Sequence, residues 1–201
     1  MTIGGRITIF LVIILIIGGI IYFQFMNDKT QTGDEIISQE ISGDVVLKTN
    51  LGDIELELFD TEAPKTVGNF KKLVGEGFYD GIKFHRVKKG FMIQGGDPLT
   101  KDDSQKVSWG MGGPGYAFED EIYTGNSNVM GSIAMANSGP NTNGSQFFIN
   151  TADNGFLDQK HTVFGKVVSG MEIVTQIENT PVGERDIPIE AIIIESAILV
   201  D

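Results

Sequence analysis

The side chains most often used for catalysis are scarce in this chain. It has two histidines, His85 and His161, in unrelated contexts, and no cysteine, so neither a zinc site nor a thiolate nucleophile is expected. Ser145 lacks the second glycine of a nucleophile elbow, which argues against a serine hydrolase. Residues 110–115 match the dinucleotide-binding pattern G-x-G-x-x-G, but no apolar strand precedes them and Pro114 stands where the phosphate-binding helix would begin. A glycine-rich loop is the better interpretation of this stretch.

Two longer segments carry a far more specific signal. The first reads FHRV at 84–87 and GFMIQGGD at 90–97, and the second reads MANSGPNTNGSQFFI at 135–149. Together with FLD at 156–158 and KHTVFG at 160–165, they closely resemble the cyclophilin family of peptidyl-prolyl cis-trans isomerases. The resemblance implies a closed eight-stranded antiparallel barrel capped by two α-helices, with a solid interior and a substrate groove on its outer surface.

The resemblance also implies that Arg86 is the catalytic cation. Rotating an Xaa-Pro bond costs about 18–20 kcal/mol, because the amide loses its resonance in the twisted state. The prolyl nitrogen then regains a lone pair, so a fixed cation aimed at it stabilises the twisted amide more than the planar one. A guanidinium suits this role because it keeps its charge and holds its donors rigidly. An ordinary surface ion pair is the weaker interpretation of Arg86 within this motif.

The other expected site residues follow from the same resemblance. Gln94 and Asn137 would hold the substrate backbone on either side of the rotating bond, one through its side chain and the other through main-chain groups. The alternative role of both residues is hydrogen bonding in a turn or at a strand edge. Gln146 would orient Arg86 by a hydrogen bond, and His161 would flank the proline pocket or only pack near a strand. No proton carrier, covalent intermediate, metal or cofactor is required. The predicted catalytic residues are Arg86, Gln94 and Asn137, and the predicted substrate-binding residues are Phe91, Met92, Ala136, Gln146, Phe148, Phe156, Leu157 and His161.

The chain departs from the family pattern at Phe156, where many members carry a tryptophan. Its only tryptophan, Trp109, lies beside the glycine-rich loop. Phenylalanine keeps an apolar wall but has no indole N–H donor, so we expect proline-peptide turnover to persist and cyclosporin-type inhibitors to bind more weakly. By the same resemblance, the stretch from Leu99 to Met111 is expected to be longer than in compact members.

Short strands separated by turns dominate the chain after the N-terminal segment. Val45, Leu47 and Thr49 alternate with Val46 and Lys48, and after a turn apolar residues alternate with glutamates along 54–58, which indicates a hairpin with one buried face. The pattern by itself allows a closed barrel or a sandwich, and the resemblance favours the barrel. Further strand-like runs lie at 83–87, 91–94, 129–136, 146–150, 162–168 and 191–200.

Two helices interrupt these strands. Pro64 is expected early in the first helix, after an N-cap at Asp60 or Thr61, and a second short helix is expected at 171–177. The first helix should bury one apolar stripe, which consists of Val67, Phe70, Leu73 and Val74.

The N-terminal segment is predicted to be a membrane anchor. Residues 7–26 carry no charge and are long enough to span the hydrocarbon layer, whereas a secretory signal is shorter and ends at a small-residue cleavage site. A buried core helix is the alternative, but no polar face exists at any helical period. Residues 1–6 are expected in the cytoplasm, because Arg6 precedes the span and acidic residues follow it. Residues 27–43 would form a polar linker and residues 44–201 an isomerase domain outside the membrane, in a bacterial cell envelope.

The charge balance limits the possible partners. The chain has 15 basic and 27 acidic residues, a net charge of −12, which argues against non-specific nucleic-acid binding. We therefore expect an isomerase that acts on proline-containing polypeptides and assists the folding of exported proteins. The alternative is a membrane-tethered module or chaperone that binds proline segments without catalysis.

Overall fold

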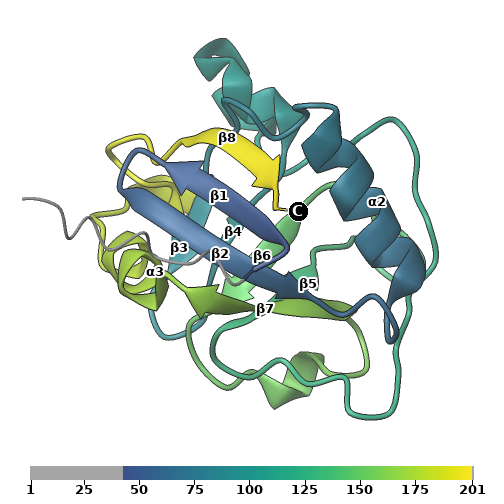
Figure 1. Cartoon of the computed structure of the whole chain (residues 1–201). Coiled ribbons are helices and arrows are strands. Elements are labelled where there is room, and N and C mark those ends of the chain that lie inside the picture. Colours follow the sequence, from purple (N-terminus) through teal and green to yellow (C-terminus); the bar gives the residue numbers. More distant parts are fainter. Residues whose placement is uncertain (1–42, 201) are drawn as a thin grey trace, which may run out of the picture. The chain divides into compact units, whose positions relative to one another are not determined.

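The computed structural model describes residues 43–200. The predicted cytoplasmic N-terminus, membrane anchor and nearly all of the linker lie outside this range. Within it, no helix is both long enough and apolar enough to cross a membrane. Eight strands form one antiparallel sheet in the order β3-β4-β6-β5-β7-β2-β1-β8 (Figure 1). The strands are β1 (Val45–Thr49), β2 (Gly52–Leu58), β3 (Arg86–Lys88), β4 (Met92–Gly95), β5 (Ser132–Met135), β6 (Phe147–Asn150), β7 (Val163–Ser169) and β8 (Ile194–Leu199).

The predicted hairpin is confirmed by β1 and β2. Leu47 pairs with Ile54 and Val45 with Leu56, and all four of these apolar side chains are buried. Gly52, at the turn, has φ of +135°, which a residue with a side chain adopts only under strain. These four side chains place one face of the hairpin in the core, and Val46 on the other face is buried as well.

The sheet is not closed into a barrel, so that prediction is wrong. β3 and β8 are the two edges of the strand order and are not paired with each other. The segments that precede them meet instead: Lys83 and Ile193 form an isolated bridge, and the Gly81 N–H donates to the Ile194 carbonyl (2.8 Å). The physical reason is the shortness of β3, which has three residues and contacts the turn at Glu184–Asp186 (η4).

Aromatic side chains fill the concave interior of the sheet. Phe70, Tyr79, Phe147 and Phe164 are all fully buried. The ring centroid of Phe70 lies 5.1 Å from that of Tyr79, 5.7 Å from that of Phe147 and 5.1 Å from that of Phe164. Rings at such spacings attract one another beyond their hydrophobic burial. The predicted solid interior is confirmed, and a binding site has to lie on the outer face of the sheet.

Two α-helices flank the sheet (Figure 1). They are α2 (Pro64–Gly75) and α3 (Met171–Glu178), close to the predicted ranges. The stripe predicted for the first helix is confirmed, because all four of its apolar residues are buried in α2. Three more short 3₁₀ helices lie in the connections, namely η1 (Pro98–Lys101), η2 (Asp103–Ser108) and η3 (Gly155–Leu157).

The predicted N-cap of α2 is wrong. The capping position holds Ala63, which has no side-chain acceptor, rather than Asp60 or Thr61. The first amide groups of the helix are bound instead by Glu121, whose carboxylate accepts from the N–H groups of Lys65 (3.1 Å) and Thr66 (2.7 Å). A distant carboxylate thus satisfies donors that have no partner within the helix and also complements the helix dipole.

Candidate active site

A groove lies on the outer face of the sheet. In β4, Ile93 points into the interior, whereas Met92 and Gln94 line the groove; in β6, Phe147 joins the interior and Phe148 lines the groove. Successive side chains of a strand point to opposite faces, so each of these four-residue strands supplies both core and site. The well-packed core thereby holds the groove residues in place.

The structure brings nine of the eleven predicted site residues to one cavity of about 260 Å³. Gln146 lines an adjoining cavity of about 320 Å³, which shares Ala136 with the first. Phe156 stands beside the groove with its ring stacked on Phe91 at a centroid distance of 5.9 Å. The nine residues are Arg86, Phe91, Met92, Gln94, Ala136, Asn137, Phe148, Leu157 and His161.

Arg86 presents an accessible cation to this cavity. It lies on β3 directly opposite Gln94 of β4, and 39% of its side chain is exposed. Its Cζ lies 6.0 Å from the centroid of the Phe91 ring, at the limit of a cation–π contact. On the other side, its Nε lies 3.6 Å from Oδ2 of Asp186. The guanidinium is thus held between an aromatic ring and a carboxylate.

Gln146 does not contact Arg86 in the way the resemblance implied. Its Oε1 accepts from Nε2 of Gln94 (3.0 Å), and its own Nε2 donates to the carbonyls of Gly110 (3.0 Å) and Gly112 (2.8 Å). Both the oxygen and the nitrogen of the Gln146 amide are thus hydrogen-bonded, so Gln146 positions Gln94 rather than Arg86. The arrangement links the groove to the glycine-rich loop.

Asp97 organises that loop. Its buried carboxylate accepts hydrogen bonds from three backbone N–H groups, those of Leu99 (2.8 Å), Gly110 (2.5 Å) and Gly112 (3.2 Å). A Cβ added at Gly112 would lie 2.0 Å from Oδ1 of Asp97, so only glycine fits there. The glycines therefore allow the backbone to approach a buried carboxylate, and they explain the loop without a phosphate ligand.

Asn137 is held by its own side chain. Its Nδ2 donates to the Lys160 carbonyl (2.8 Å), and its Oδ1 accepts from the Gly139 N–H (3.3 Å). Both ends of the amide are thus engaged within the protein. The main chain of Asn137 is the part left for a ligand, and contact with the substrate through it stays a prediction.

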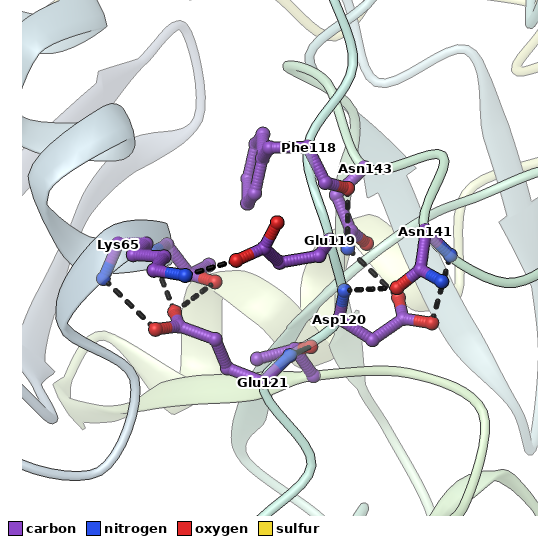
Figure 2. Close-up of polar contacts among 9 residues, drawn as sticks. Lys65, Phe118, Glu119, Asp120, Glu121, Asn141 and Asn143 are labelled. Carbon is purple, nitrogen blue, oxygen red and sulfur yellow. Dashed lines mark hydrogen bonds and ion pairs between the residues drawn. The ribbon is translucent and has the colours of Figure 1, made fainter.

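A network of side chains braces the loop after Asn137 (Figure 2). The Asp120 carboxylate accepts from the Asn141 N–H (2.9 Å) and from Nδ2 of Asn143 (2.8 Å), and the Asp120 N–H donates to Oδ1 of Asn141 (2.9 Å). Asn141 has φ of +59°, a left-handed conformation that asparagine tolerates better than most residues. Glu119, the residue before Asp120, forms an ion pair with Lys65 at the start of α2.

Apolar side chains form the floor and one wall of the groove. Met92, Phe148 and Leu157 are almost fully buried, and they pack in a cluster separate from the main core. His161 lies edge-on to Phe148 with 5.4 Å between centroids, and its Nδ1 is 2.9 Å from the Met135 carbonyl, which fixes the ring. The result is a small apolar pocket beside a cation, which suits a compact non-polar ring attached to a polar backbone.

His85 takes no part in the groove. It is buried, neither ring nitrogen has a hydrogen-bond partner, and desolvation lowers its pKa to about 4. The imidazole is therefore neutral at pH 7, and its place near Gly110 indicates a packing role.

The predictions from sequence missed three acidic residues that organise the site. Asp97 stands at the end of the motif at 90–97, two residues after the end of β4, and that position could have drawn attention to it. Asp120 and Asp186 stand outside the quoted motifs and carry no local signal. Their roles depend on partners that are distant in sequence.

Comparison with known proteins gives a consistent result. Residues 44–199 match the family described as "Cyclophilin type peptidyl-prolyl cis-trans isomerase/CLD". A Staphylococcus aureus (strain USA300) protein that carries the name of a peptidyl-prolyl cis-trans isomerase is 43% identical, over 85% of this chain and 98% of its own length. A Staphylococcus epidermidis (strain RP62A) protein with the same name is 42% identical over the same shares.

Solved structures of a cyclophilin-type isomerase from Cryptosporidium parvum show the same fold. One has a TM-score of 0.71 and 38% identity, and the comparison covers 78% of this chain and 96% of that one. A second, determined in the presence of the dipeptide Ala-Pro, gives the same score and identity over 78% and 98%. The match over 44–199 and the curated relatives together show that this chain belongs to the cyclophilin-type peptidyl-prolyl cis-trans isomerase family.

Proposed function

We propose that the groove catalyses rotation about Xaa-Pro bonds with Arg86 as the cation that faces the prolyl nitrogen. The observation that carries this proposal is that Arg86 and the apolar side chains of Met92, Phe148 and Leu157 line one cavity. A proline ring bound on the apolar floor would bring its nitrogen to the cation at the edge. Because the nitrogen is a better acceptor when the amide is twisted, the guanidinium stabilises the transition state more than the ground state.

The amide groups around the pocket would hold the substrate backbone. Gln94 offers its side chain, which Gln146 keeps in place, and Asn137 offers its main chain on the opposite side. Holding both flanks lets the bond between them turn without moving the rest of the peptide. The C. parvum structure determined with Ala-Pro supports a small proline-containing peptide as the ligand class.

A protease-free isomerisation assay on Xaa-Pro peptides tests this function. The full chain should accelerate the exchange, and Arg86→Ala should not approach the wild-type rate. The rival function is a module that holds proline segments without catalysis. Equal rates from wild type and variant, with peptide binding intact in both, would favour that module.

We also propose that cyclosporin-type inhibitors bind this chain weakly, because Phe156 supplies no N–H donor. Its ring is 66% exposed and stacked on Phe91, so an indole at this position could reach a ligand carbonyl. Restoring one hydrogen bond contributes about 1 kcal/mol, so Phe156→Trp should tighten binding about fivefold to tenfold in a calorimetric titration with cyclosporin. Phe156→Leu is the control, which should bind no tighter than wild type. An unchanged Kd for the tryptophan variant would contradict this explanation.

We propose further that residues 7–26 anchor the chain in a bacterial cell membrane with the isomerase domain outside, where it assists the folding of exported proteins. Support comes from the uncharged apolar run and from the charges that flank it. Tethering would raise the local concentration of the enzyme near emerging chains. In intact cells with a single membrane, added protease should digest the domain. A domain that resists digestion until the membrane is breached would contradict this topology.

A further inference from the structure

The turn at η4 reaches the groove from outside the sheet. Arg185 and Asp186 both have φ of +60°, a left-handed conformation that is unfavourable for a residue with a Cβ. Adjacent strained residues persist only where their surroundings hold them, and they occur most often at functional sites. Their side chains point to two different partners, which accounts for the strain.

Arg185 attaches this turn to the long loop after β4. Its Nη1 donates to the Val107 carbonyl (2.8 Å), and its Nη2 donates to the carbonyls of Lys106 (3.1 Å) and Trp109 (3.2 Å). The loop is itself tied down, because Nε1 of Trp109 donates to the Leu99 carbonyl (3.1 Å). The stretch at 99–109 thus forms the support for the η4 turn.

Asp186, the next residue, turns to the groove. Its Oδ2 lies 3.6 Å from Nε of Arg86. Both side chains are close to 40% exposed, so an ion pair of this kind contributes little to stability. A flexible arginine has many rotamers, and a carboxylate held near Nε restricts them.

We propose that Asp186 is a positioning residue for Arg86, and that the loop at 98–109 holds it in place through Arg185. This inference rests on the proposed role of Arg86 in catalysis. The loop then acts on the reaction without touching the substrate, because it determines where the carboxylate stands and therefore where the guanidinium points.

Substitutions at Asp186 separate this role from a structural one. Glycine adopts φ of +60° without strain, so Asp186→Gly removes the carboxylate while keeping the turn. It should lower kcat about tenfold, as small misplacements of a catalytic group do, with KM changed less than twofold because the apolar pocket is intact. Asp186→Asn keeps the shape of the side chain and tolerates the left-handed conformation but removes the charge, so it should lose activity nearly as Asp186→Gly does, because the contact with Arg86 is an ion pair at 3.6 Å. The melting temperature of Asp186→Gly should equal or exceed that of wild type.

Two further variants of the full chain complete the experiment. Glu184→Gln removes a negative charge from the same turn without contacting Arg86, and it should leave kcat unchanged. In an Arg86→Ala background, Asp186→Gly should have no further effect on the rate. Two results would show that the inference is wrong while the proposed function stands. In the first, Asp186→Gly keeps the wild-type kcat although Arg86→Ala is impaired. In the second, Asp186→Gly lowers kcat further in the Arg86→Ala background. If Arg86→Ala equals wild type, the proposed function itself fails.

Discussion

Arg86→Ala is expected to lower kcat/KM on Xaa-Pro peptides by about 10²–10³-fold, the usual effect of removing a donor aimed at a transition-state charge. The pocket proposed for the proline ring is lined mainly by other side chains, so most of the loss should appear in kcat. The free energy of unfolding should change by less than about 1 kcal/mol, because the Arg86–Asp186 pair is exposed. Protease-free isomerisation kinetics and urea unfolding measure the two quantities.

Two matched variants show whether the effect belongs to the guanidinium. Arg86→Lys keeps the charge but not the rigid fork of donors, so its rate should lie between those of wild type and Arg86→Ala. Lys71 also pairs with an exposed carboxylate, that of Asp60, far from the groove, and Lys71→Ala should leave the rate unchanged. A rate for Arg86→Ala within threefold of wild type would exclude Arg86 as the catalytic cation.

Asp97→Ala is expected to destabilise the domain by about 3–5 kcal/mol. Three backbone N–H groups donate to its buried carboxylate, and hydrogen bonds to a charged acceptor contribute about 1.5–3 kcal/mol each, of which water bound to the freed N–H groups would recover a part. Without the carboxylate these donors are left with no partner or must admit water. Urea unfolding of the full chain measures the loss, and the m-value shows whether the transition stays two-state.

Asp97→Ala should also weaken substrate binding, because the glycine-rich loop that Asp97 holds contacts the groove residues. The carbonyls of Gly110 and Gly112 bind Gln146, which in turn holds Gln94, so a displaced loop should also raise KM. Asp97→Asn keeps one acceptor oxygen and should lose less stability, about 2 kcal/mol. Asp53→Ala is the control at an exposed acid, with a change within about 0.5 kcal/mol. A loss below 1 kcal/mol for Asp97→Ala would mean that the carboxylate does not organise the loop.

Local patterns in the sequence predict the elements well, for physical reasons. The alternation along 45–58 indicates the hairpin because a pleated strand exposes every second side chain to water. The stripe of α2 is visible because its apolar residues recur at helical spacing. The motifs at 84–97 and 135–149 identify the residues of the groove, but only by resemblance to a family. No local rule shows that Gln94 and Asn137 meet at one cavity.

Contacts between distant segments decide what local patterns cannot show. Glu121 caps α2 from 55 residues away, so the expectation of a local cap at Asp60 or Thr61 fails. The sheet would close only if β3 paired with β8. The three residues of β3 contact η4 instead.

The hairpin, the two helices and the apolar stripe of α2 can be predicted from neighbouring residues, and the motifs indicate the family and its candidate residues. The open sheet, the hydrogen bond between Gln146 and Gln94, and the contacts of Asp97 and Asp186 become visible only in the folded chain. The reason is that side-chain period and backbone preference are properties of neighbouring residues, whereas a carboxylate finds its partner only after the folded chain has brought remote segments within hydrogen-bonding or ion-pairing distance.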